Sequence, residues 1–346
     1  MFLRFITAAM ISLALTGPAG AQDRAAELAK RIEPFVDEQT VLVGHVDVTR
    51  VDAQTLADWL LQTIKAAKLD PELEEQIVAP LAPARQMGGA WLDAFRRAGG
   101  KDVFFLISLA DLPGLAIIAP LDKNADPRAV AGLLFSGDAG GPTSQPAERH
   151  GFLDAAKQIR GAVVLGPSAV LKRLEQNKGV ARPDLKTAFA AAGDAPVRVA
   201  IIMDPDTRRV ITEMVPRLPK ELGGEPGTAL SKGIQWGAAW LELPPKPSVH
   251  VLVESADRES AEALVRVWQA LLRAAGQDPE LALFLDEELI KTLAPKITGQ
   301  RVTLELDTQQ LRQVLAPRLA KMLVRAREQA KAAQSSGSSI SSARVA

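Results

Sequence analysis

The stretch VFFLISLADLPGLAIIAPL, from Val103 to Leu121, predicts two apolar strands joined by a turn at Leu112-Pro113-Gly114. An amphipathic helix that begins at Asp126 follows them. The same order returns later in the chain without a gap, from Ile234 to Val265. A repeated apolar hairpin with a helix behind it needs a neighbour that covers its apolar face. The stretch therefore predicts a fold built from two copies of one unit.

The flanking segments extend this pattern in both directions. An apolar strand at 41–48 precedes the first hairpin, and a strand at 197–203 precedes the second. A strand pair follows each helix, at 152–165 and at 297–306, and a further helix comes after it. We therefore predict the α+β class, with two tandem β-α-β-β-α-β-β-α units, antiparallel sheets and helices packed on one face. This order resembles the split β-α-β plan in its topology.

The boundaries of the predicted parts follow from turns and composition. We predict a signal peptide at 1–21, a first unit at 22–192 with a helical insert at 70–100, and a second unit at 193–333. A Ser-rich tail at 334–346 is predicted to be disordered, because such a composition buries too little apolar surface. Two sheets side by side and one continuous sheet across a pseudo-dyad would both cover the apolar faces.

The N-terminus predicts export. Arg4 precedes an apolar run from Phe5 to Leu15, and Gly17-Pro18 breaks this run ahead of Ala19-Gly20-Ala21. These are the three regions of a signal peptide, and the small residues predict cleavage after Ala21. The mature chain is then expected to be periplasmic or secreted, without a transmembrane span. It contains no cysteine, so it must be stable without disulfides.

The charge balance excludes a general attraction to polyanions. Lysine and arginine number 41, as do aspartate and glutamate. Such a chain has no global field that favours nucleic acid or an anionic membrane. Motifs for nucleotide binding, for a hydrolase nucleophile and for metal binding are absent from the sequence. We therefore expect no cofactor and no nucleic-acid partner.

His45 and Asp47 form the most suggestive pair for catalysis. On a strand they point to the same face, two residues apart. An aspartate beside an imidazole can fix its tautomer and raise its pKa, as a general base requires. The alternative is a polar pair at the exit of a buried strand, in which Asp47 bonds to the backbone of the following turn. Exposure of His45 in a cleft distinguishes the two hypotheses.

Several aspartates stand at the ends of predicted strands. Asp204 and Asp206 are the one Asp-x-Asp pair among them that could hold a cation. Nearly all of these acids come just before a helix, where a carboxylate accepts free backbone N–H groups. We therefore predict helix caps, with a metal site at Asp204 and Asp206 as the alternative. The acids concerned are Asp47, Asp126, Asp204, Asp257 and Asp307.

The C-terminal helix from Asp307 has an apolar stripe and a basic outer part. The basic residues are Arg318, Lys321, Arg325, Arg327 and Lys331. A docked amphipathic helix with a basic end accounts for this pattern. Weak contact with a membrane surface or an acidic partner is the alternative.

These observations predict an exported, non-enzymatic binding or structural module. Its partner in the extracytoplasmic space, a protein or a small molecule, is not specified by the sequence. A secreted hydrolase that uses His45 and Asp47 is one alternative, and a carrier of apolar ligands between two curved sheets is another. A functional site is expected where the two copies differ, namely in the 70–100 insert and the 137–151 loop.

Overall fold

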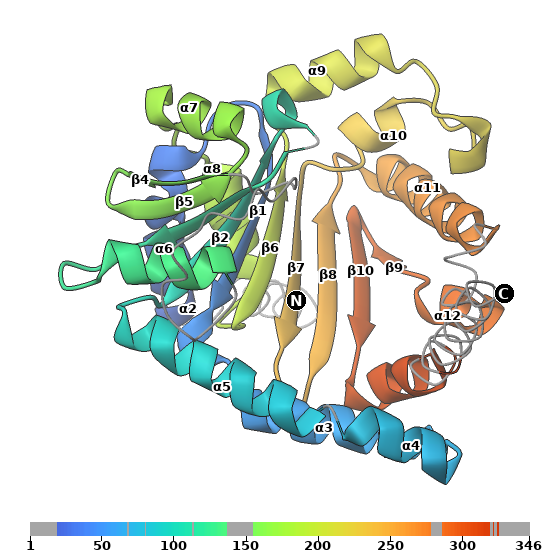
Figure 1. The fold of residues 1–346 in the computed structure, drawn as a ribbon. Helices are drawn as coiled ribbons and strands as arrows, with labels where there is room; N and C mark the ends of the chain where they lie inside the picture. The colour runs from blue at the N-terminus through green and yellow to red at the C-terminus, as the bar shows by residue number, and fades with distance from the viewer. Residues whose placement is uncertain are drawn as a thin grey trace, which may run out of the picture.

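The described part of the chain forms one antiparallel sheet of ten strands (Figure 1). The structure is a computed structural model, and it describes residues 19–67, 69–79, 81–112, 114–136, 155–277 and 286–318, with positions 321 and 324. The strands follow the order β4-β5-β3-β2-β1-β6-β7-β8-β10-β9. The central neighbours β1 and β6 are antiparallel, with Leu42 opposite Ile201 and Val46 opposite Val197.

The first half of the chain contributes the strands on one side of this centre. They are β1 (Thr40–Asp47), β2 (Asp102–Ser108), β3 (Ala116–Pro120), β4 (Ala155–Ile159) and β5 (Ala162–Gly166). The second half contributes β6 (Val197–Ile202), β7 (Trp236–Glu242), β8 (Ser248–Glu254), β9 (Lys296–Thr298) and β10 (Arg301–Leu306). Read outward from the centre, the two halves repeat the same strand order.

Helices fill the connections between the strands. They are α2 (Ala19–Ile32), α3 (Ala53–Ala66), α4 (Pro71–Val78), α5 (Leu81–Arg97), α6 (Pro127–Ser136), α7 (Ser168–Gln176), α8 (Pro183–Ala191), α9 (Pro205–Met214), α10 (Thr228–Ser231), α11 (Arg258–Gln277) and α12 (Glu287–Thr292). Short 3-10 turns lie at η1 (Glu33–Phe35), η2 (Val48–Arg50), η3 (Leu109–Asp111) and η4 (Lys220–Leu222). Residues 308–318 are also helical.

The predicted α+β class with antiparallel pairing is confirmed. One continuous sheet is formed, rather than two sheets side by side. The predicted insert at 70–100 contains α4 and α5. Descent of the two halves from a duplicated unit stays a prediction. The signal peptide up to residue 18, the 137–151 loop with His150, and the Ser-rich tail lie outside the described residues.

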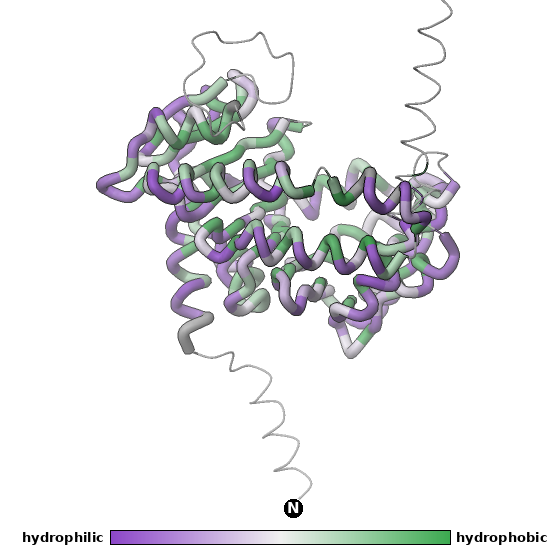
Figure 2. The backbone as a smooth tube through the Cα atoms, turned by 60° about the horizontal axis from the view of Figure 1, so that its bottom comes forward, coloured by the Kyte–Doolittle hydropathy of each residue, from purple (hydrophilic) through white to green (hydrophobic). Residues whose placement is uncertain are grey.

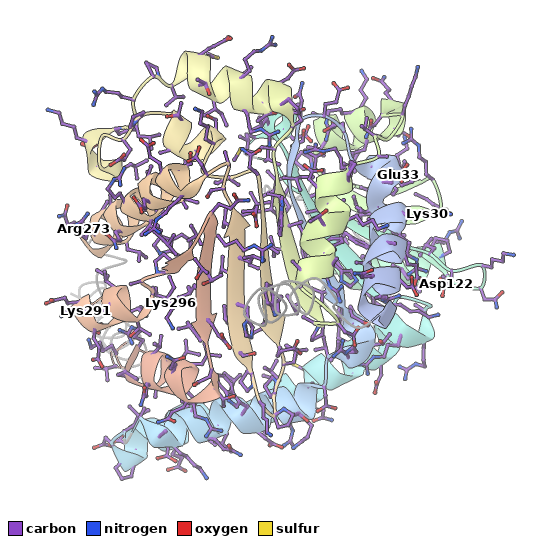
Figure 3. All side chains as sticks on the ribbon, turned by 180° about the vertical axis from the view of Figure 1, so that it is seen from behind. Lys30, Glu33, Asp122, Arg273, Lys291 and Lys296 are labelled. Carbon is purple, nitrogen blue, oxygen red and sulfur yellow. The ribbon has the colours of Figure 1, made fainter. Side chains whose placement is uncertain are left out.

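Helices cover both faces of the sheet, whereas the sequence predicted one. On one face, here the α8 face, α2, α7 and α8 pack against Val43, Phe104 and Ile118. In the view from behind, α2 and α8 run side by side across it (Figure 3). On the opposite face, the α6 face, α5 and α6 pack against Val103 and Ala119. Strand residues of the first half are apolar on both faces, so both need a cover.

The helices present apolar stripes to the sheet. Hydrophilic and hydrophobic residues alternate along them, as Figure 2 shows. On the α6 face of the second half, α11 packs through Leu264 and Val265 against Val253 and Val302. None of the helices in the described segments is both long and apolar enough to cross a membrane.

The largest apolar cluster crosses the predicted boundary between the units at 192 and 193. It joins Phe35, Phe104 and Phe189 of the first half to Ala200 and Ala238 of the second. The two halves therefore share a core, and α8 packs on the sheet where they meet.

This shared core predicts a large effect of truncating Phe189. Phe189 is fully buried, so Phe189→Ala should lower the free energy of unfolding by about 3–5 kcal/mol. Urea denaturation measures the difference. As a control, Leu271→Ala on α11, where the side chain is 53% exposed, should change it by less than about 0.5 kcal/mol. Equal effects of the two variants would contradict the packing of α8 on the sheet.

Candidate functional site

His45 lies inside the protein, on the α8 face of β1. The residue is 1% exposed, and its ring lies 4.8 Å from the ring of Phe104 and 6.4 Å from that of Phe189, between ring centroids. Its Nε2 atom lies 2.8 Å from Oδ1 of Asp102. Asp102 is 1% exposed and begins the neighbouring strand β2. The imidazole is thus enclosed by aromatic side chains and bonded to a buried carboxylate.

Two arginines of α2 complete the environment of Asp102. Arg24 donates to Oδ1 of Asp102 at 3.2 Å, and Arg31 donates to Oδ2. Arg31 also donates to Asp122 at 2.9 Å. Arg24 and Arg31 are two turns apart on one face of the helix. The buried carboxylate is therefore the point where α2 is attached to the sheet.

Burial and these partners determine the protonation states. Burial lowers the pKa of His45 below its usual value near 6.5, although the bond to Asp102 acts in the opposite direction. For Asp102, burial acts to raise the pKa, but the bond from His45 and the charges of Arg24 and Arg31 outweigh it and lower the pKa. At neutral pH an uncharged His45 therefore donates its Nε2–H to an ionised Asp102. Its Nδ1 is buried and has no hydrogen-bond partner among the described residues.

Arg198 is the cross-strand neighbour of His45, and it is also 1% exposed. Its guanidinium donates to the carbonyl oxygens of Ala195 and Gly193, just beyond the end of α8. These carbonyls lie next to the negative pole of that helix, which stabilises a buried cation. The positive charge of Arg198 also disfavours a proton on His45 and so contributes to its lowered pKa.

Asp47 does not contact His45 in the way that the catalytic hypothesis requires. It accepts from the backbone N–H of Thr49 at 3.1 Å and lies 3.6 Å from Arg24. His45 is enclosed and does not line a cleft, and this result counts against the hypothesis of a hydrolase that uses His45 and Asp47. Sequence reasoning missed Asp102, because the register that brings it beside His45 is not visible in the sequence. The seven-residue spacing of Arg24 and Arg31 was a usable signal for the ion pairs.

Asp204 and Asp206 make different contacts and do not form a common site. Asp204 accepts from the backbone N–H of Thr207 and caps α9, while Asp206 is 3.2 Å from Arg209 at the surface. Among the described residues, no group of three potential metal ligands is found. The predicted caps are confirmed at Asp126, Asp257 and Asp307 as well, and the last forms a reciprocal capping box with Gln310.

The C-terminal helix directs one of its basic residues inward. The Arg318 side chain is 8% exposed and pairs with Asp286, the cap of α12. Lys321 lies 3.9 Å from the same carboxylate. Both contacts belong to a docked helix. The basic positions 325, 327 and 331 lie outside the described residues, so contact with a membrane surface stays a prediction.

The middle of the α6 face carries apolar side chains that belong to none of the buried clusters. On β6, Ala200 and Ile202 point to the α8 face and are fully buried, whereas Val199 and Ile201 point to the α6 face and are partly exposed. On the neighbouring strands β1, β2 and β7, apolar residues that point to the α6 face are also partly exposed. We define the central apolar surface as Leu42, Ile107, Val197, Val199, Ile201, Ala239 and Leu241, all partly exposed.

The position of this surface is visible in Figure 1. The middle of β6 and β7 is seen directly there, between α6 on one side and α11 on the other. Phe105 and Val46 border the central apolar surface on the side of α5 and α6, and Val249 and Val251 border it on the side of α11. The surface is thus an apolar strip between two helix-covered parts of one sheet.

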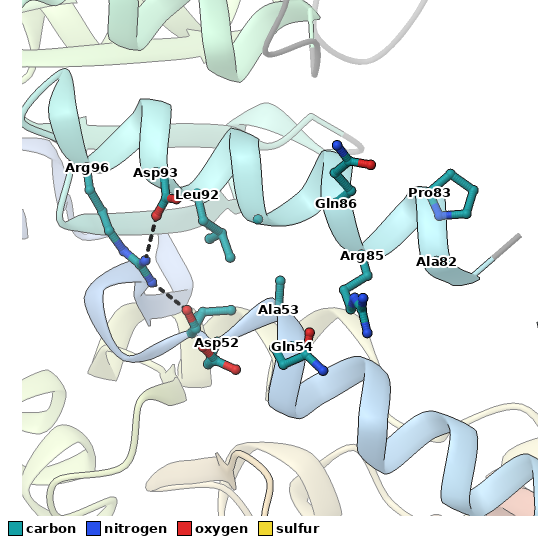
Figure 4. A pocket seen from close by; sticks show the side chains of 12 residues that line it. Asp52, Ala53, Gln54, Ala82, Pro83, Arg85, Gln86, Leu92, Asp93 and Arg96 are labelled. Carbon is teal, nitrogen blue, oxygen red and sulfur yellow. Dashed lines mark hydrogen bonds and ion pairs between the residues drawn. The ribbon is translucent and has the colours of Figure 1, made fainter.

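A groove lies where the helical insert crosses α3 (Figure 4). It has a volume of ≈ 620 Å³. Its lining residues are Val51, Asp52, Ala53, Gln54, Ala82, Pro83, Arg85, Gln86, Gly89, Leu92, Asp93 and Arg96. The groove therefore lies between the start of α3 and the insert that distinguishes the first unit from the second. A functional role of the insert stays a prediction.

Comparison with known proteins adds no function to this geometry. No protein-family model matches the chain, and searches of curated proteins and of solved structures found no match either. The candidate sites are therefore the enclosed His45 cluster, the central apolar surface and the groove at the insert.

The His45 cluster predicts a loss of stability on acidification. An unfolded histidine takes up a proton near pH 6.5, whereas His45 in the folded chain takes it up only at lower pH. Acidification below that value therefore favours the unfolded state, by at most about 1.4 kcal/mol per pH unit for one proton. We expect His45→Gln to have a flatter dependence of unfolding free energy on pH between about 6.5 and 5.

Chemical denaturation at a series of pH values measures this slope. The control is Phe104→Leu, which weakens the same core without removing a titrating group and should keep the wild-type slope. An unchanged slope in His45→Gln would show that His45 protonates equally in both states.

Proposed function

We propose that the chain is an exported, non-enzymatic binding module that carries an apolar ligand on the central apolar surface. The observation that supports this function is the uneven coverage of adjacent residues on β6. Ile202 is fully buried, while Ile201 on the opposite face is partly exposed and belongs to no buried cluster. A contiguous apolar patch left in contact with water favours a binding site over a purely structural surface.

The form of the site differs from the carrier considered on sequence grounds. That carrier held its ligand between two curved sheets, whereas a single sheet is present here. The ligand would lie on one face of the sheet, flanked by α6 and α11 (Figure 1). A site of this kind gains affinity from the burial of apolar ligand surface.

Export is the second part of the proposal. It rests on the charged, apolar and small-residue regions at 1–21. A carrier in the periplasm or outside the cell would transfer apolar molecules through water, where they are poorly soluble. A hydrolase is not proposed, because His45 is enclosed and bonded to Asp102.

Binding of linear alcohols tests the apolar site without involving charge. Affinity should rise about fourfold for each added methylene group, since burial of one CH₂ contributes about 0.8 kcal/mol. Titration calorimetry with octanol, decanol and dodecanol measures this series. Affinities that do not depend on chain length would contradict an apolar site.

A paired substitution locates the site. Ile201→Asp places a charge in the central apolar surface and should weaken dodecanol binding at least tenfold, since a buried charge lacks compensation there. Leu271→Asp makes the same change at an exposed position of α11 and should leave binding intact. Thermal melting of both variants checks that they remain folded. Equal affinities would place the ligand elsewhere.

Export predicts a defined N-terminus. Mass analysis of protein from the exported fraction should find a chain that starts at Gln22, because cleavage follows Ala21. Substitution of Ala21 by a large residue should leave the precursor uncut. Exported protein that retains Met1 would contradict the predicted processing.

A further inference from the structure

The groove between α3 and α5 continues the apolar strip of the sheet. Three of its lining residues, Val51, Ala53 and Leu92, belong to the apolar cluster of the α6 face. Val46 and Phe105, which border the central apolar surface, pack against that same cluster. β1 leads from Leu42 in the middle of the sheet to Val46 and then, through η2, to Val51. The floor of the groove and the sheet face are thus parts of one apolar layer.

The polar residues around the groove are mostly paired within the protein. Asp52 caps α3 by accepting from the backbone N–H of Thr55, and this bond lowers the pKa of its carboxyl. Arg96 donates to the carbonyl oxygens of Val48 and Val51 and lies 3.4 Å from Asp93. These groups hold η2 against α5, so they are occupied by structural contacts.

Arg85 differs from these residues. Within the described segments it has no hydrogen bond or ion pair, and it is exposed. Figure 4 shows its side chain directed from α5 toward α3, across the gap that contains Gln54. The Arg85 guanidinium, which has no partner among the described residues, therefore lines a groove whose floor is apolar. An anionic group at this position would gain an ion pair and hydrogen bonds from the guanidinium.

We propose that this groove binds the carboxylate of a long-chain fatty acid, whose alkyl chain extends onto the central apolar surface. The inference rests on the proposed apolar site and adds the class of ligand. The unpaired Arg85 selects an anionic head group, and the shared apolar cluster provides the path for the chain. Two independent features of one groove thus match the two ends of an amphiphile.

Comparison of dodecanoate with dodecanol tests the head-group site, because the two probes share their alkyl chain. The mature chain should bind dodecanoate three- to fivefold more tightly than dodecanol, as expected for an exposed ion pair. This preference should shrink as salt is added. Arg85→Gln should remove the preference and leave dodecanol binding unchanged. Arg97→Gln removes the same charge from α5 outside the groove and should keep the preference.

The outcomes separate this inference from the proposed function. A preference for dodecanoate that Arg85→Gln does not reduce would overturn the head-group site. If dodecanol still binds in that case, the proposed apolar site is not contradicted. Failure of both probes to bind would overturn the apolar site itself. Dodecyl phosphate is a third probe, and tighter binding of it than of dodecanoate would replace the carboxylate by a phosphate head group.

Discussion

Pairing of β1 with β6 joins two half-sheets into one, and the remaining architecture depends on it. Strands lie about 4.8 Å apart, so ten of them make a sheet roughly 45 Å wide. Helices pack about 8–10 Å apart, so about four or five of them would be needed to cover one face. Among the described helices, α2, α7 and α8 pack on one face, and α3, α5, α6, α11 and the helix at 308–318 pack on the other. On the α6 face these helices lie over the two sides and one end of the sheet, so the apolar strand surface at its centre has no described helix above it (Figure 1).

The two faces of the centre are covered differently for a physical reason. On the α8 face, α2 is attached by Arg24 and Arg31 to the buried Asp102, and α8 is tied to the sheet by Arg198. These charge-assisted contacts orient the helices over the β1–β6 junction, and Phe189 of α8 packs in the buried cluster on that face. On the α6 face, α6 and α11 follow the strands of their own halves and lie on either side of the junction (Figure 1). The central apolar surface is the consequence.

Much of the fold could be predicted from the sequence, because it depends on local patterns. The apolar hairpins at 103–121 and 234–253, and aspartates such as Asp204 and Asp257 before helices, predict the order of the elements. Which face a helix covers depends on packing between distant segments, and the prediction of helices on one face was wrong in the first half.

The sites were harder to predict for the same reason. The partner of His45 is Asp102, more than fifty residues away, and only the register of β1 and β2 brings them together. The insert at 70–100 interrupts the repeat and lines part of the groove, and its role as a functional site stays a prediction. Val199 and Ile201 are partly exposed because no described helix packs over them. The sequence of β6 alone does not predict which of its faces a helix covers.

Methyl NMR of the chain from residue 22 onward, during titration with dodecanol, tests the central claim most directly. Ile201 and Ile202 are adjacent on β6 and point to opposite faces, so each serves as the control for the other. The account predicts that the methyl signals of Ile201 and Ile107 shift with ligand, while those of Ile202 and Ile118, which are fully buried on the α8 face, stay in place. Signals that do not move, or that move equally on both faces, would contradict a binding site on the central apolar surface.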